Sequence, residues 1–274
     1  MSGGPSSGPV RRTAMLDSAG AYLTQVFAVA DAEVIKLRHD PTDLISRAVQ
    51  PILWLLLFGQ VMAHVRGLNT TGGDYLDFLA PGILAQSVLF VAIFYGLSAI
   101  WERDLGVLHR YMVSPAPRSA LVIGKALASS SRGLSQAVVI YACAALMGVG
   151  LSFRPVDLAL VAGLIVLASA LFSTFSLIIA CIVKTRERFM GVGQFLTMPI
   201  FFASNAIYPL TLMPGWLRVV ARINPLSYQV DALRCLMLKG GHSQFGLGLD
   251  AGVLLLVTAL LIVIATRLYP RLTQ

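Results

Sequence analysis

Charged residues are scarce in this sequence. They make up 12% of the 274 residues, whereas hydrophobic residues make up 57% and the mean hydropathy is +0.77. Soluble domains carry roughly 25% charged residues, and a soluble chain of this length could not bury so much apolar surface. The composition therefore excludes a soluble globular protein and predicts an all-α integral membrane protein.

Cysteine is also rare. The three cysteines, Cys143, Cys181 and Cys235, lie far apart without metal-ligand spacing, and the first two fall in apolar runs. Isolated cysteines of this kind are usually small buried residues. The sequence therefore predicts neither a disulfide framework nor a metal site. A secretory signal is not expected either, because no long apolar run follows closely on the Gly-, Ser- and Pro-rich start.

A phosphate-binding loop is missing from the sequence. Gly124-Lys125 is followed by Ala126 and lacks the upstream glycine that the pattern G-x-x-x-x-G-K-[ST] requires. We therefore expect this chain to bind no ATP and to carry no cofactor of its own. If ATP drives its activity, a separate polypeptide binds the ATP and the Mg²⁺.

Ionisable residues are absent from the deep part of the apolar runs. Intramembrane enzymes and proton-coupled transporters need such residues at that depth. Ser173 and Ser176 have no His or Lys in the same run, and we expect them to bond their own helix backbone or to pack against a neighbouring helix. A membrane enzyme and a non-transporting membrane anchor are therefore minor alternatives.

Six runs free of Lys, Arg, Asp and Glu approach the roughly 20 residues that span a bilayer. They predict six transmembrane helices, at Ala48–Val65, Phe78–Trp101, Gly133–Phe153, Leu158–Val183, Phe189–Leu217 and Ala251–Thr266. The last run is short, but residues 247–249 can extend it. We expect residues 1–16 to form a disordered tail and residues 17–274 to form a single transmembrane domain. Within it, Asp17–Asp40 is amphipathic but too charged to span, and predicts an N-terminal interfacial helix.

The distribution of the 21 basic residues predicts the orientation. Most of them fall in segments that lie on the cytoplasmic side if the N-terminus is inside. Because short loops rich in Lys and Arg stay in the cytoplasm, both termini are expected there. Topology and anionic lipids thus explain the net charge of +8, and nucleic acid is not an expected partner.

The segment Trp101–Arg132 is the longest charged stretch between apolar runs. Its first part carries one helical apolar stripe, at Trp101, Leu105, Leu108 and Met112. Pro115 and Pro117 then end this helix, and a new one follows. A helix of this kind can lie along the membrane surface with its charges toward another protein. A solvated loop without a partner explains the pattern equally well.

The segment before the last run predicts an outer pair of short helices. The first carries an apolar stripe at Trp216, Val219, Val220 and Ile223. The second begins with Asn224 as N-cap and Pro225 at the first helical position, and it ends at Gly240-Gly241. Its own stripe comprises Leu226, Val230, Leu233 and Met237, and Asp231 and Arg234 are spaced for an ion pair. The two helices are expected to form an outer lid or a re-entrant hairpin.

Two spaced motifs carry a resemblance to a known family. The first comprises Glu102-Arg103, Gly106, Leu108, Ser114-Pro115, Arg118 and Gly124-Lys125. The second comprises Pro214-Gly215-Trp216, Asn224-Pro225-Leu226-Ser227-Tyr228, Asp231, Ala232 and Arg234. On these residues the chain resembles the permease subunits of ABC-2-type ABC transporters, a family of daunorubicin-type drug exporters and bacterial polysaccharide or nodulation-factor exporters. The resemblance covers nearly the whole chain after its first dozen residues.

The resemblance implies an exporter subunit in the cytoplasmic (inner) membrane of a bacterium. Its expected partners are the lipid bilayer, two copies of a P-loop ATPase subunit, and a second permease chain in a homodimer or a related heterodimer. The segment after the second span would be the coupling helix that docks on the ATPase. The expected docking residues are Glu102, Arg103, Leu105, Leu108, Arg110 and Tyr111, and the expected outer-helix residues are Trp216, Asn224, Pro225, Tyr228, Asp231 and Arg234.

The resemblance also implies that cargo moves along the second and fifth spans. The candidate path residues there are Gln86, Phe90, Phe94, Tyr95, Gln194, Phe201, Asn205 and Tyr208. Packing against lipid or neighbouring helices explains each aromatic residue by itself. Gln194 and Asn205 are the stronger candidates, because an amide facing lipid would be left unpaired. An apolar, aromatic path with a few amides suits a hydrophobic or amphipathic drug, lipid or polyketide-like molecule, and thus drug efflux and antibiotic resistance. A polysaccharide or glycolipid is the alternative cargo.

Overall fold

The computed structural model describes residues 49–59, 61, 75–105, 118–183 and 185–269. The predicted tail and interfacial helix lie outside these residues, as do three expected docking residues, Leu108, Arg110 and Tyr111. The described chain is helical apart from its connections and one isolated antiparallel bridge, between Leu151 and Leu238.

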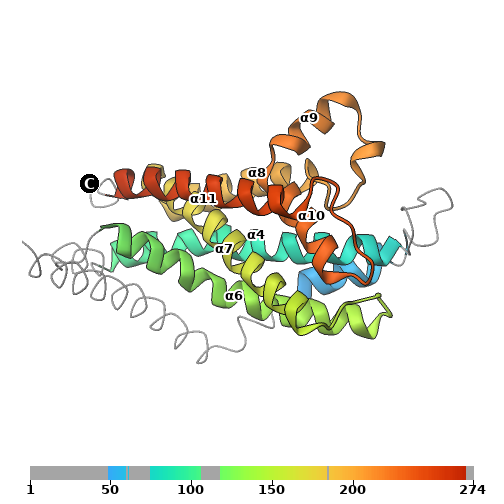
Figure 1. The fold of residues 1–274 in the computed structure, drawn as a ribbon. Helices are drawn as coiled ribbons and strands as arrows, with labels where there is room; N and C mark the ends of the chain where they lie inside the picture. Colours follow the sequence, from blue (N-terminus) through green and yellow to red (C-terminus); the bar gives the residue numbers. More distant parts are fainter. Residues whose placement is uncertain (1–48, 60, 62–74, 106–117, 184, 270–274) are drawn as a thin grey trace, which may run out of the picture.

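Five long helices run side by side and alternate in direction (Figure 1). They are α4 (Tyr75–Asp104), α6 (Arg118–Leu146), α7 (Pro155–Ile182), α8 (Arg186–Phe202) and α11 (Leu247–Leu268). The shorter elements are η1 (Trp54–Phe58), η2 (Leu210–Leu212), α9 (Gly215–Ile223) and α10 (Pro225–Met237). The ends of α4, α7 and α11 therefore meet the starts of α6 and α8. We call this the Glu102 end of the bundle, and the other the Arg234 end.

Three described helices are long and apolar enough to cross a membrane: α4, α7 and α11. The first two coincide with the predicted second and fourth spans, and α11 includes the expected extension at residues 247–249. In α6 the basic segment from Arg118 continues without a break into the third predicted span. This helix ends at Leu146, before Gly148 adopts a positive φ of 82°.

The predicted fifth span, Phe189–Leu217, is wrong at its C-terminal end. Its helix, α8, stops at Phe202, and the chain then turns through residues 203–209 before η2. Pro199 removes a backbone donor within the last turn of α8. The hydroxyl group of Ser204 then bonds the carbonyl of Phe201 and the amide of Ala206, which supports a turn instead of a continued helix.

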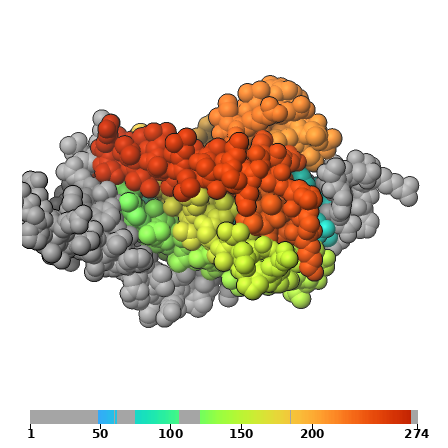
Figure 2. Space-filling view, in the orientation of Figure 1, coloured from blue at the N-terminus to red at the C-terminus, as the bar shows by residue number. Residues whose placement is uncertain are grey.

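Helix α4 forms the centre of the bundle, whereas α11 lies on its surface. In α4, 78% of the most apolar 18-residue window is buried within the chain. In α11, only 17% of the corresponding window is buried. Helix α4 packs against α6, α7, α8 and α10. Figure 2 shows α11 extending across one face of the molecule, with the segment around α9 forming a separate projection. Lipid must therefore cover most of α11.

Small residues bring α4, α6 and α7 close together. The hydroxyl groups of Ser129 and Ser130 donate to carbonyl oxygens of α7, and that of Ser176 donates to the carbonyl of Ile93 in α4. Gly96 lies directly against Ser176, so a side chain there would overlap it. Close backbone approach with hydroxyl bonds between helices is typical of helix association in membranes. Ser176 therefore bonds a neighbouring helix and not its own.

Replacement of Gly82 by Ala tests the close contact at the Arg234 end. A methyl group at Gly82 would overlap the backbone carbonyl of Ala206, so we expect Gly82→Ala to lower the free energy of unfolding by about 1–3 kcal/mol. Gly163→Ala is the matched control, because nothing lies within 4 Å of a methyl group there. Thermal unfolding in detergent measures both. Equal stability of the two variants would contradict the close contact.

Candidate functional site

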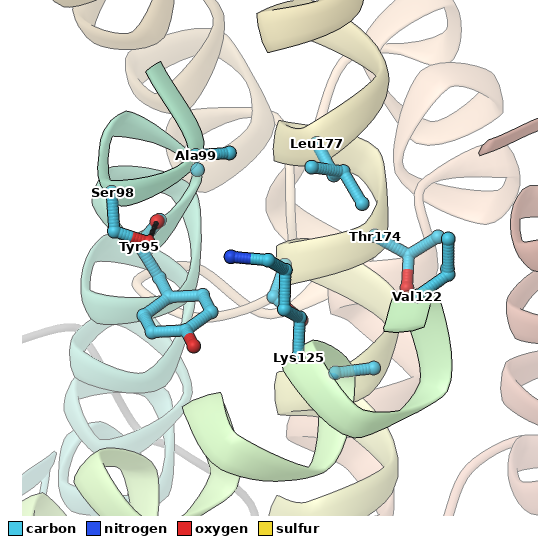
Figure 3. A pocket seen from close by; sticks show the side chains of 10 residues that line it. Tyr95, Ser98, Ala99, Val122, Lys125, Thr174 and Leu177 are labelled. Atoms are coloured by element: carbon cyan, nitrogen blue, oxygen red, sulfur yellow. Dashed lines mark hydrogen bonds between the residues drawn. The ribbon is translucent and has the colours of Figure 1, made fainter. Parts of the chain in front are cut away.

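The last turn of α4 forms a partly buried ion pair with α6. The Lys125 ammonium nitrogen lies 2.5 Å from Glu102 Oε2, and the two side chains are 8% and 14% exposed. In Figure 3 the Lys125 side chain leaves α6 and its nitrogen points toward α4. Glu102 is thus directed toward α6, although the sequence placed it on a docking surface.

A second pair of contacts joins the same turn to α8. Asp104 accepts from Arg186 at 2.9 Å and from its neighbour Arg103, also at 2.9 Å. The guanidinium of Arg186 lies 4.1 Å from the centre of the Trp101 ring, a cation–π contact. Leu105 is exposed. The last turn of α4 therefore contacts the first residues of α8 as well as α6.

The cavity beside Lys125 is too small for a cargo molecule. It lies between α4, α6 and α7 and measures about 10 Å³, room for one water molecule (Figure 3). Its hydroxyl groups, on Ser98, Ser173 and Thr174, bond carbonyl oxygens of their own helices. The expectation for Ser173 is therefore confirmed.

Arg234 connects three segments at the opposite end of the bundle. It is 7% exposed, and its Nη2 donates to the carbonyl of Asn205 at 2.6 Å while its Nε donates to that of Phe78 at 3.3 Å. Its guanidinium also lies 3.6 Å from the centre of the Phe78 ring. Burial lowers the pKa of Arg234 to about 9 and the nearby Asp231 carboxylate raises it, so the guanidinium stays charged at neutral pH. Arg234 thus joins α10 to α4 and to the turn after α8.

Asp231 and Arg234 do not form the expected ion pair. Asp231 Oδ2 instead accepts from the hydroxyl group of Ser243 and from the backbone amides of Gln244 and Phe245, at 2.7–3.0 Å. The predicted cap is confirmed, because the Asn224 side chain accepts from Leu226 N at 3.0 Å and Pro225 begins α10. The amide of Asn224 also donates to carbonyls at the end of α8, so the cap joins these two helices.

The first turn of α4 makes further contacts at the Arg234 end. The Tyr75 hydroxyl donates to the carbonyl of Ile207 at 3.2 Å, and Asp77 accepts from the amide of Gly150 at 3.0 Å. The connection between α6 and α7 also pairs with the end of α10, where Lys239 N donates to Gly150 O at 2.8 Å. Helix α4 is therefore bonded to its neighbours by its first turn as well as by its last.

The candidate path residues do not line one continuous surface. Gln86, Phe90 and Phe94 share one side of α4, whereas the Tyr95 ring faces Arg132 of α6, 5.2 Å away. Asn205 is buried beneath Arg234, Gln194 and Tyr208 are exposed, and Phe201 contacts Trp54 edge to face. After its first turn, which exposes Glu187 and Arg188, the exposed face of α8 is apolar except for Gln194 and comprises Met190, Gly191, Gln194, Phe195, Pro199 and Phe202.

The helical segment around η1, near the start of the described chain, continues this apolar surface. Leu53, Leu57 and Val61 are exposed, and together with Trp54 and Phe58 they line a shallow groove of about 380 Å³. The contact between Trp54 and Phe201 places the groove beside α8. Among the described residues, this is the apolar surface large enough for a drug-sized molecule.

The apolar stripe of α9 points away from the protein. Trp216, Val219 and Ile223 are 58–76% exposed, whereas Ala221 packs with Leu210 and Met213. Tyr228, on α10, donates its hydroxyl to the carbonyl of Arg222 and stacks near Phe245. Helix α9 thus presents its apolar side outward, as expected of an outer helix that contacts lipid.

Replacement of Arg234 by Lys tests its connecting role. An ammonium group has no planar fork to reach both carbonyls, so we expect a loss of about 1–3 kcal/mol in the free energy of unfolding. Arg222→Lys, at an exposed position on α9, should change it by no more than about 0.5 kcal/mol. Thermal unfolding in the same detergent measures both variants. If Arg234→Lys leaves the free energy of unfolding unchanged, Arg234 does not have this connecting role.

Comparisons with known proteins place these features in a family. A family model described as ABC-2 type transporter matches residues 24–238. The putative transport permease ycf38 of Cyanophora paradoxa is 29% identical over 219 residues, 78% of this chain and 74% of that protein. The daunorubicin resistance ABC transporter permease protein DrrB1 of Streptomyces coeruleorubidus is 28% identical over 268 residues, 96% and 88% of the two chains.

A third relative is the inner membrane transport permease YadH of Escherichia coli (strain K12). It is 26% identical over 200 residues, which cover 70% of this chain and 73% of that protein. The family match includes α4, α6, α7, α8, α9 and α10, and so contains the Glu102–Lys125 pair and Arg234 with its partners. The chain is therefore a membrane-embedded transport permease and belongs to the ABC-2 type transporter family.

Proposed function

We propose that this chain is the permease subunit of an ATP-driven exporter that moves a hydrophobic or amphipathic small molecule out of the cytoplasm or the inner leaflet. The observation that supports this cargo is the apolar surface formed by the exposed face of α8 and the groove along Trp54 and Phe58. Gln194 is its polar residue, and the exposed charged residues of α8, Glu187 and Arg188, lie in the first turn of the helix, before this surface begins. The relative DrrB1 is named for daunorubicin resistance, which agrees with a cargo of this class.

The proposed path follows the second and fifth spans. Phe90 and Phe94 lie on α4 with their ring centres 6.2 Å apart, and Phe201 and Phe202 lie at the end of α8 at 5.2 Å. Trp54 extends the aromatic series through its contact with Phe201. Aromatic faces bind flat apolar molecules without directional bonds, which suits several related cargoes. Two permease chains, identical or related, would enclose such a path between them.

We further propose that two copies of a P-loop ATPase, which bind the ATP and Mg²⁺, dock at the Glu102 end. This end would face the cytoplasm of a bacterium, with both termini on the same side. The paired charges there support this, because Glu102 contacts α6 and Asp104 contacts α8. A displacement of the segment after α4 would therefore be transmitted to α4, α6 and α8 together. The docking surface itself would comprise Arg103, Leu105, Leu108, Arg110 and Tyr111, with Glu102 fixing the direction of the helix.

Transport assays test the cargo directly. The chain is expressed with its ATPase partner in inverted membrane vesicles, and ATP-dependent uptake is measured for a fluorescent amphipathic drug and for a lipid-linked oligosaccharide. We expect uptake of the drug and none of the oligosaccharide. Gln194→Leu and Phe202→Ala should lower drug uptake, whereas Leu256→Ala, on the exposed side of α11, should not. Uptake of the oligosaccharide alone would establish the alternative cargo.

A charge exchange tests the coupling contact. Glu102→Lys should lose ATP-driven transport, because breaking a buried pair costs about 3–5 kcal/mol. The double variant Glu102→Lys/Lys125→Glu restores opposite charges and should regain most of the transport. Glu187→Lys, a charge reversal at an exposed position of α8, is the control that should stay active.

Co-purification of the ATPase is measured for each of these variants. If the double variant binds the ATPase but remains as inactive as Glu102→Lys, the pair does not support coupling. If the ATPase co-purifies equally with the wild type and with variants that reverse the charge of Arg103 or replace Leu105, the docking proposal fails at this end of the protein.

A further inference from the structure

Two buried carboxyl groups share one serine hydroxyl at the Arg234 end. The Ser243 Oγ lies 2.8 Å from Asp231 Oδ2 and 3.0 Å from Asp250 Oδ2. Asp231 and Asp250 are 1% and 0% exposed, and they belong to α10 and α11. The serine lies in the connection between these helices, so the three residues join both helices to their connecting loop.

The hydroxyl cannot satisfy two ionised carboxylates. A serine hydroxyl has one proton and two lone pairs. One lone pair already accepts from the backbone amide of Gly246, at 2.7 Å. The proton can be donated to only one of the two aspartates. The remaining contact is a hydrogen bond only if that aspartate itself donates a proton to the second lone pair of the oxygen.

The surroundings decide which aspartate is ionised. Asp231 Oδ2 also accepts from the backbone amides of Gln244 and Phe245, and three donors on one oxygen stabilise a carboxylate. The Oδ1 atoms of both aspartates have no described partner, so the difference lies at Oδ2, where Asp250 has the hydroxyl as its one described partner. An unpaired charge at a fully buried site is costly. The protonated Asp250 carboxyl group therefore donates a hydrogen bond to Ser243 Oγ, and the Ser243 hydroxyl donates one to Asp231.

Positive groups around the pair do not change this assignment. The described ion pairs all lie at the Glu102 end, so none neutralises Asp250. On α10, Arg234 donates to the carbonyls of Phe78 and Asn205. In the connecting loop, Lys239 and His242 are exposed. From α7, which also packs against α11, no charged side chain bonds either aspartate among the described contacts.

We propose that Asp250 is a neutral acid at neutral pH and that the chain Asp250–Ser243–Asp231 is a proton-dependent latch. While Asp250 holds its proton, the loop is bonded to both helices. Loss of that proton to water leaves two negative carboxylates and one hydroxyl proton, so one bond breaks and the charges repel. Phe245 follows Ser243 closely and packs with Leu210, Met213 and Ala221, so release of the loop would also loosen the support of α9.

Infrared spectroscopy tests the protonation state on the full chain in lipid. At neutral pH the carbonyl stretch of a protonated carboxyl group should be present in the wild type and absent in Asp250→Asn. Asp157→Asn is the matched control, because Asp157 accepts from a single serine, Ser152, at 2.6 Å and needs no proton of its own. The band should persist in that variant. A band that persists in Asp250→Asn would overturn the assignment.

The pH dependence of the melting temperature tests the latch itself. The native state holds a proton that the unfolded chain releases at lower pH, so the wild-type stability should fall as the pH rises through neutrality. The difference between wild type and Asp250→Asn isolates this site, since an asparagine amide still donates to Ser243. The melting temperature of the wild type minus that of Asp250→Asn should decrease as the pH rises. A difference that does not change with pH would exclude the latch. Both tests use the permease without cargo or ATPase, so their result is independent of the proposed function.

Discussion

The guanidinium of Arg234 is the interaction on which the Arg234 end of the structure depends. Three segments meet at this one side chain: α10, the first turn of α4, and the turn that follows α8. The turn after α8 exposes backbone carbonyls that no helix satisfies, and burying them without donors would be costly. A single charged, planar group provides those donors. Because it is buried, its bonds are not weakened by competition with water.

Helix α4 connects this end to the other. Its first turn bonds to residues 150, 207 and 234, and its last turn pairs with Lys125 and Arg186. Between them, small residues hold α4 tightly against α6 and α7. Helix α8 is different: it packs against α4, but its outer face is exposed in the described part of the chain and its last turn contains Pro199. The described structure therefore combines a tightly packed centre with a less constrained helix beside the proposed path.

Local chemistry made part of this fold predictable from the sequence. Asn224-Pro225 begins α10 and Leu226, Val230, Leu233 and Met237 are all buried, because caps and helical periodicity depend on neighbouring residues alone. The partners of charged residues were not predictable in this way. Arg234 bonds carbonyls 29 and 156 positions away, and Glu102 pairs with Lys125 across a segment of 23 residues. An i,i+3 spacing suggested an Asp231–Arg234 pair, but each side chain had a better partner that only the tertiary arrangement provides. The predicted fifth span was too long for a different reason: its apolar run continues past Phe202, where Pro199 and the Ser204 hydroxyl end the helix.

The exposed surface of α11 makes the position of this helix sensitive to the thickness of the bilayer. Its 22 residues extend about 33 Å, slightly more than a hydrocarbon core of about 30 Å. Because the outward side of α11 is exposed, the thickness of the surrounding lipid acts on its tilt together with its packing against α7 and α10. Asp250 lies in the first turn of this helix. A change in membrane thickness would therefore move one side of the hydrogen-bonded chain that joins α10 to α11, and lipid composition would act on the outer helices without binding to any pocket.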